Sequence, residues 1–119
     1  MSTDVRSHAL KMIIAIVQRG KADSVVNAAI RGGAPAATVV FGRGQGIRER
    51  LGPLGIAIQP EKEVILIVLE EWLCDQVLAA MVAAGHLDKP GVGFVFVVPV
   101  DKAVGFIQAE AVESAPARR

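Results

Sequence analysis

The chain has 119 residues and a mass of 12.5 kDa, which is room for one compact domain. Hydrophobic residues make up 52% and charged residues 21%, and this composition excludes disorder for the bulk of the chain. Thirteen Lys and Arg against twelve Asp and Glu leave a net charge of +1, so we expect no nucleic-acid partner, because neutralising phosphates needs a basic excess.

The first half of the chain predicts a strand, a helix and a second strand. The β-branched run at residues 12–17 is typical of a buried strand, and a turn follows at residues 19–20. Apolar residues then recur with helical spacing at Ala22, Val25, Val26, Ala29 and Ile30. The glycines at residues 32–33 end this helix, since glycine accepts the left-handed conformation of a helix terminus. Residues 36–41 predict the second strand.

The second half repeats this order. Residues 64–69 predict a strand, and a helix begins at the acidic residues 70–71, where carboxylates favour the helix dipole. Its apolar stripe consists of Cys74, Val77, Leu78, Met81 and Val82. Gly85 ends the helix, and residues 91–98 predict the fourth strand. The offset of 52 residues from Gly33 to Gly85 also separates the two helical stripes.

Two strand–helix–strand halves in tandem predict the α+β class, with a ferredoxin-like βαββαβ fold. Its four-stranded antiparallel sheet would carry both helices on one face. The strands at residues 12–17 and 64–69 are apolar on both faces, although a wet second face would alternate apolar and polar residues. Monomers rarely expose an apolar face of this size. We therefore predict a homo-oligomer, most simply a closed ring; the alternative is that tail or loop residues cover the face.

Few residues suit catalysis or metal binding. His8 lies in the predicted flexible segment 1–9, and His86 follows a helix end, where a cation is favourable. The single cysteine, Cys74, lies on a buried stripe and excludes a disulfide or a cysteine-based zinc site. We predict no enzymatic activity, no catalytic residues and no metal site. No apolar run approaches the roughly 20 residues that span a bilayer, and a signal peptide is absent, so we expect a cytoplasmic protein without direct membrane insertion.

Two glycine clusters form the candidate site. Residues 42–60 join the second and third predicted strands, where a tight turn would suffice, and loops of this length are usually functional. Residues 42–60 are not followed by the helix that a dinucleotide-binding fingerprint requires, and they lack the Gly-Lys-Ser/Thr of a P-loop. Residues 89–93 precede the last strand, and Gly91 and Gly93 there would let an anion approach the backbone.

These segments resemble the P-II nitrogen-regulatory signalling family over about residues 10–107. The resemblance is carried by the strands at residues 11–17 and 38–39, the glycine-rich loop, and Gly91-x-Gly93-x-Val95-Phe96-Val97, its most specific piece. It implies a homotrimer that acts in signal transduction and nitrogen regulation and binds adenine nucleotides in clefts between subunits. It also implies a mobile T-loop, here residues 43–58, that regulates a membrane transporter or an enzyme. We expect residues 108–119 to form a flexible tail.

The resemblance also implies particular contact residues. Ligand or nucleotide contacts come from Thr38, Gly42, Arg43, Gly44 and Gln45 of one subunit and from Lys89, Gly91, Val92 and Gly93 of the next. Partner contacts come from Ile47, Arg48, Arg50, Leu51 and Leu54. Gln45 is the candidate for the family's glutamine at the loop base, which helps bind 2-oxoglutarate through a metal.

The chain differs from the family at three positions where the family has positively charged residues. Phe94 stands in place of a phosphate-binding lysine, and Gly105 and Ile107 stand in place of two phosphate-binding arginines. Their loss removes most charge-assisted bonds to a triphosphate. We therefore expect weak or absent ATP binding, with ADP or AMP favoured over ATP, and no certain cofactor. The alternative function is a structural or metal-responsive trimer of the same architecture without nucleotide sensing.

Overall fold

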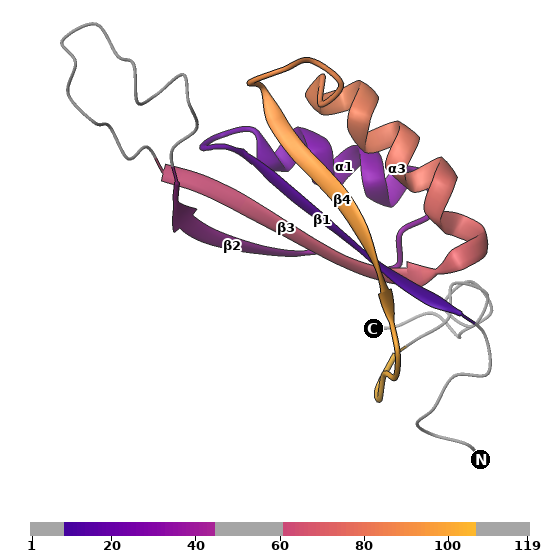
Figure 1. Cartoon of the computed structure of the whole chain (residues 1–119). Coiled ribbons are helices and arrows are strands. Elements are labelled where there is room, and N and C mark those ends of the chain that lie inside the picture. Colours follow the sequence, from indigo (N-terminus) through magenta and orange to yellow (C-terminus); the bar gives the residue numbers. More distant parts are fainter. Residues whose placement is uncertain (1–8, 45–60, 107–119) are drawn as a thin grey trace, which may run out of the picture.

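The computed structural model describes residues 9–44 and 61–106, and Figure 1 shows how they are arranged. The elements of the described residues, in chain order, are β1 (Leu10–Gln18), α1 (Ala22–Arg31), β2 (Thr38–Arg43), β3 (Glu61–Glu70), α3 (Glu71–Gly85) and β4 (Gly93–Val100). This βαββαβ order confirms the predicted α+β, ferredoxin-like fold. β1 and β3 are longer than predicted, and β2 and β4 are shifted by two residues toward the C-terminus. The strand ends differ because pairing with neighbouring strands sets where each strand stops.

The four strands form one antiparallel sheet in the order β2-β3-β1-β4. β1 is central, so that Ile13 lies opposite Ile67 of β3 and Val97 of β4. Both helices pack side by side on one face of the sheet, as predicted (Figure 1). The fully buried large side chains between the layers are Ile13, Ile65, Ile67 and Leu69 from the strands and Val25, Val77 and Met81 from the helices.

The helix ends differ in detail from the prediction. In α1 the buried residues include Ala28, whereas the predicted core residue Ile30 is 45% exposed at the edge of the stripe. Gly33 has the expected positive φ, 116°, just after α1. In α3 the left-handed residue is His86 and not Gly85. A glycine at position 85 is required for space, because a Cβ there would lie 2.9 Å from Val25 Cγ2 of α1.

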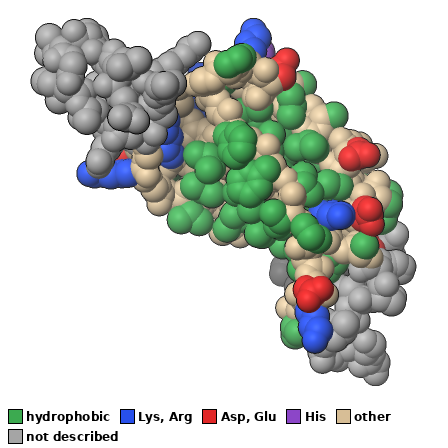
Figure 2. Space-filling view, viewed as in Figure 1, with side chains coloured by type: hydrophobic (Ala, Val, Ile, Leu, Met, Phe, Trp, Pro, Cys, Tyr) green, Lys and Arg blue, Asp and Glu red, His purple; other side chains and the backbone are tan. Residues whose placement is uncertain are grey.

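The sheet face opposite the helices is apolar, which confirms the prediction of strands that are apolar on both faces. The alternation of the paired strands places on it Met12, Ile14, Ile16, Thr38, Val40, Val64, Leu66, Val68, Phe94, Phe96 and Val98. We call this set the open face. Figure 2 shows hydrophobic side chains gathered over it. Phe94 is 61% exposed there, and the centroid of its ring lies 5.4 Å from that of Phe96. Most other side chains of the open face are half-buried, so the described residues cover this face only in part.

Several predictions concern segments outside the described residues. They include the flexible ends, the loop between β2 and β3, Gln45, Ile107 and the predicted partner contacts Ile47, Arg48, Arg50, Leu51 and Leu54. The domain boundaries also remain predictions. Among the described residues, neither α1 nor α3 is long and apolar enough to cross a membrane.

Candidate functional site

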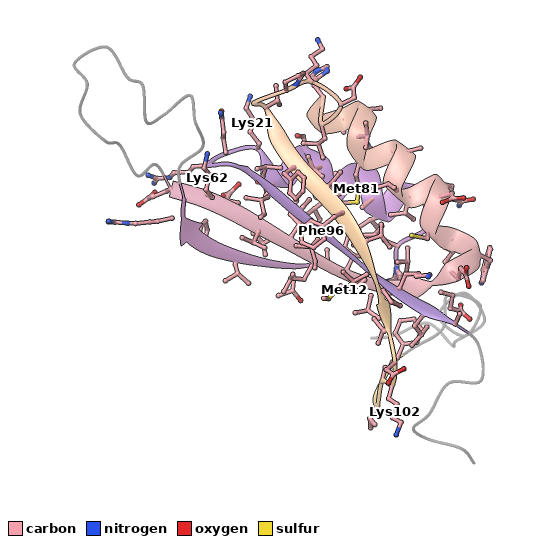
Figure 3. All side chains as sticks on the ribbon, in the orientation of Figure 1. Met12, Lys21, Lys62, Met81, Phe96 and Lys102 are labelled. Atoms are coloured by element: carbon pink, nitrogen blue, oxygen red, sulfur yellow. The ribbon has the colours of Figure 1, made fainter. Side chains whose placement is uncertain are left out.

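Several segments far apart in the sequence meet at the end of the sheet where β2 ends and β3 begins. Glu63 of β3 lies opposite Phe41 of β2 on one side and Val17 of β1 on the other, and Val17 lies opposite Gly93 of β4. The β1–α1 turn and the α3–β4 turn complete this end, at which Figure 3 labels Lys21. We call it the loop end of the sheet. Both predicted glycine clusters reach it.

An open cavity of about 390 Å³ lies at the loop end beside β2. Its described lining residues are Arg19, Phe41, Gly42, Arg43 and Glu61. The Arg19 guanidinium forms an ion pair with the Glu61 carboxylate at 2.7 Å, and both side chains are well exposed, at 72% and 50%. Phe41 is 71% exposed although it is aromatic. The cavity therefore combines two guanidinium groups, one carboxylate and a bare aromatic ring.

Glu63 fixes the turn that carries Arg19. Lys21, at the N-cap position of α1, makes no side-chain capping bond. Glu63 Oε1 instead accepts hydrogen bonds from the backbone N–H groups of Gly20 at 3.1 Å and Ala22 at 2.8 Å. A carboxylate at a helix N-terminus satisfies amides that have no partner within the helix and complements the helix dipole. Since β3 supplies this cap, the β1–α1 turn is held against the strand that borders the cavity.

The fold requires glycine in the second cluster but not at the described positions of the first. Gly93 is required for packing, because a Cβ there would lie 3.0 Å from the backbone oxygen of Ile16 and 2.7 Å from Leu87 Cδ2. Gly91 has a φ of 82° in the α3–β4 turn. Among residues 9–44 and 61–106, by contrast, a Cβ on Gly42 would meet nothing within 4 Å, and one on Gly44 would meet a lysine side-chain carbon at 3.8 Å. The fold therefore explains Gly91 and Gly93 by itself, whereas it does not require glycine at positions 42 and 44.

The structure separates Thr38 from the other β2 candidates within one chain. Thr38 lies opposite Leu66, whereas Arg43 lies opposite Glu61, and the five residue steps from Thr38 to Arg43 span about 17 Å at about 3.4 Å per residue. Thr38 borders a different cavity, of about 470 Å³, with largely apolar neighbours that include Met12 and Phe106.

The second cluster lies at the same end of the sheet but at its opposite edge. The Lys89 N–H donates to the His86 carbonyl at 3.1 Å, and Val92 N–H donates to the Lys89 carbonyl at 3.3 Å, which shapes the α3–β4 turn. Val92 lines a small cavity of about 190 Å³ with Lys21 and His86. Because β3 and β1 lie between β2 and β4, these two edge strands are about 14 Å apart, three spacings of about 4.8 Å. A single chain does not bring them together.

Sequence reasoning missed Arg19, Phe41 and Glu61 as neighbours of Arg43. Arg19 lies in a predicted turn, and Glu61 precedes the predicted third strand. Their proximity depends on strand register, which local patterns do not specify. Phe41 carried a usable signal, since a phenylalanine next to Gly42 at the end of an edge strand has little to pack against.

The described residues offer little for catalysis or metal binding. They contain no group of three His, Cys, Asp or Glu side chains placed to hold a metal ion. Cys74 is buried, as predicted, and burial, with smaller contributions from Asp75 and Glu71, raises the pKa of its thiol. A raised pKa disfavours the thiolate that nucleophilic chemistry needs.

The order of elements and the paired register define a small ferredoxin-like α+β protein. A family model, that of the nitrogen regulatory protein P-II, matches residues 10–110, and the chain belongs to this family. The match confirms the resemblance found in the sequence and makes the chain a member of a family of regulatory proteins. No curated protein is similar enough to the chain to count as a match.

Proposed function

We propose that this protein is a non-enzymatic, homotrimeric signal-transduction protein that senses a small anionic metabolite or an adenine nucleotide. The ligand binds in clefts between subunits, and the segment between β2 and β3 regulates a partner, a transporter or an enzyme. One observation carries the proposal: the chain belongs to a regulatory family, and its glycine-rich segment Gly42, Arg43 and Gly44 lies at the loop end of the sheet.

A second copy of the chain is needed to complete the proposed cleft. The cluster around Arg43 and the cluster around Lys89 lie at opposite edges of one sheet, whose edge strands are about 14 Å apart. A neighbouring subunit whose β4 edge approaches β2 brings them to one ligand. The open face supports such an assembly, because burying its apolar side chains against other copies removes them from water.

The charge of the site favours ligands with few phosphates. Phe94 lies on the open face at the loop end, opposite Ile16, and supplies no cation where the family has one. Gly105 likewise lacks a side chain that could bind phosphate. A triphosphate brought into this cleft would lose hydration that the remaining Arg43 and Lys89 replace only in part. We therefore propose ADP or AMP in preference to ATP.

A thermal-shift screen tests the proposal directly. The full chain is heated with ATP, ADP, AMP, bicarbonate or 2-oxoglutarate, and a ligand that binds only the folded state raises the melting temperature by mass action. Mass measurement in the same buffer should report about three times 12.5 kDa. A stable monomer at micromolar concentration that responds to none of these compounds would refute the proposed function.

Deleting residues 47–55 should leave the trimer intact and abolish binding of the regulated partner.

A further inference from the structure

One acidic side chain is buried without a partner where β3 ends, at the end of the sheet opposite the loop end. Glu70 is only 2% exposed, and its Oε1 atom accepts no hydrogen bond from the described residues. It occupies the N-cap position of α3 but makes no capping bond, and it forms no ion pair within residues 9–44 and 61–106. Buried carboxylates are normally paired or hydrogen-bonded, because removing the charge from water is costly. The described part of the chain therefore leaves this carboxylate without a donor.

A lysine without an ion pair lies at the same end of the sheet. Glu70 is opposite Leu10 of β1, which is opposite Val100 of β4, and strand alternation places these three positions on the side of the open face. Lys102 follows two residues after Val100, is exposed, and has no ion pair among the described residues. Figure 3 shows Lys102 at this end of the molecule, far from Lys21 at the loop end. An unpaired carboxylate and an unpaired cation therefore share one end of the sheet.

The cleft proposed above brings these two groups together between copies. It places Gly93 of the partner subunit beside Arg43, so that β4 of that subunit runs antiparallel to β2. Glu61 is opposite Arg43, and nine residue steps lead from Glu61 to Glu70. The same nine steps lead from Gly93 to Lys102. At about 3.4 Å per residue both distances are about 31 Å, so Lys102 of the partner subunit arrives at the level of Glu70.

The two side chains can reach each other at that level. β2 begins at Thr38, opposite Leu66, so it ends its pairing with β3 four residues before Glu70. The partner subunit's β4 would lie two strand spacings from β3, about 10 Å. Extended lysine and glutamate side chains together span about this distance. Lys102 is also the only lysine or arginine between residues 94 and 106, so it is the cation that this strand can supply.

We propose that Glu70 forms a buried ion pair with Lys102 of the partner subunit, and that this pair fixes the register in which two copies assemble. The proposal rests on the assembly proposed above and deepens it, since it names the residue that each copy contributes. A copy shifted along the strands would leave a buried carboxylate and an ammonium group unpaired, which is strongly unfavourable. Apolar contacts alone would tolerate such a shift more easily. The pair therefore selects the register that also aligns the two halves of the ligand cleft.

A double-mutant cycle on the full chain tests the pair. Mass measurement over a range of protein concentrations gives the concentration at which half of the trimer has dissociated. Glu70→Gln and Lys102→Gln should each raise that concentration at least about tenfold, because each leaves one charge at the interface without its partner. The double variant should raise it no further than either single variant, since the interaction is already lost.

Two matched controls remove charges close to the pair. Glu71→Gln removes the exposed carboxylate next to Glu70, and Lys11→Gln removes a lysine at the same end of the sheet on its helix face. Each control should change the dissociation concentration by about threefold or less, as surface substitutions usually do.

Charge reversal shows whether the pair joins two copies or lies within one. Chains with Glu70→Lys or with Lys102→Glu should each dissociate when alone, because like charges then face each other at every interface. Mixing the two variants should restore trimers, since two of the three interfaces in a mixed ring pair opposite charges. A pair within one chain would be restored by the double reversal but not by mixing. Circular dichroism confirms that each variant is folded, and the glutamine cycle decides if a reversal unfolds the chain.

The outcomes separate this pair from the proposed function. A wild-type trimer whose dissociation is unchanged by Glu70→Gln or by Lys102→Gln, or in which the two effects add, refutes the pair and leaves the signalling trimer standing. A trimer that follows the cycle but responds to none of the compounds in the thermal-shift screen refutes the sensing function alone. A stable wild-type monomer refutes both.

Discussion

Replacing Glu63 by alanine should destabilise the protein far more than its position near the surface suggests. Glu63 Oε1 accepts two backbone hydrogen bonds, from Gly20 at 3.1 Å and Ala22 at 2.8 Å, and no capping bond from Lys21 replaces them. Loss of an N-cap costs about 0.5–2 kcal/mol, and a charged acceptor places this case in the upper half of that range. We expect Glu63→Ala to lower the free energy of unfolding by about 1.5 kcal/mol.

A graded series of variants makes this prediction sharp. Glu63→Gln keeps an oxygen acceptor but loses the charge that favours the helix dipole, so it should cost about 0.5–1 kcal/mol. Glu61→Gln is the matched control, because it removes a carboxylate two residues away whose ion pair with Arg19 is exposed and worth about 0.5 kcal/mol or less.

Urea denaturation followed by circular dichroism measures the three free energies at one protein concentration, since assembly makes apparent stability depend on concentration. In melting curves the Glu63→Ala change corresponds to a fall of about 5 °C or more. If Glu63→Ala lowers the free energy of unfolding no more than Glu61→Gln does, the Glu63 carboxylate does not cap α1. The conclusion that Glu63 holds the β1–α1 turn in place is then wrong as well.

Four further predictions follow from other positions. Gly93→Ala should destabilise by about 1–3 kcal/mol, because its Cβ would crowd the backbone oxygen of Ile16 at 3.0 Å as well as Leu87 Cδ2 at 2.7 Å, whereas Gly42→Ala should be neutral in urea melts. Leu66→Asp, on the open face, should convert the proposed trimer to a monomer in mass measurements; a trimer of unchanged mass would contradict the face as an interface. Phe94→Lys should tighten ATP binding in calorimetry, and no gain would mean that the phosphate site lies elsewhere. The raised thiol pKa of Cys74 means that the unfolded chain loses its proton first, so stability should fall as pH rises through the ordinary thiol range; Cys74→Ala should remove this component.

The order of elements and their class follow from local patterns of the sequence alone. The β-branched runs around Ile14 and Leu66 indicate strands, the stripes around Val25 and Val77 indicate helices, and the repeat with its 52-residue offset from Gly33 to Gly85 indicates the βαββαβ fold. The open face is also readable, because each strand carries its own apolar residues on both sides. These properties depend on residues close together in the chain.

The candidate site depends on contacts that no local pattern encodes. Register places Glu61 beside Arg43, the fold brings Arg19 from an earlier turn to within 2.7 Å of Glu61, and Glu63 caps a helix 41 residues before it. Only the packing distances distinguish Gly93, where a Cβ would crowd the Ile16 backbone and Leu87, from Gly42, where a Cβ would meet none of the described residues within 4 Å. The sequence by itself therefore determined the fold and its apolar face, through local periodicity. The tertiary structure alone decided which charges meet, because a contact between distant residues depends on where the whole chain has packed.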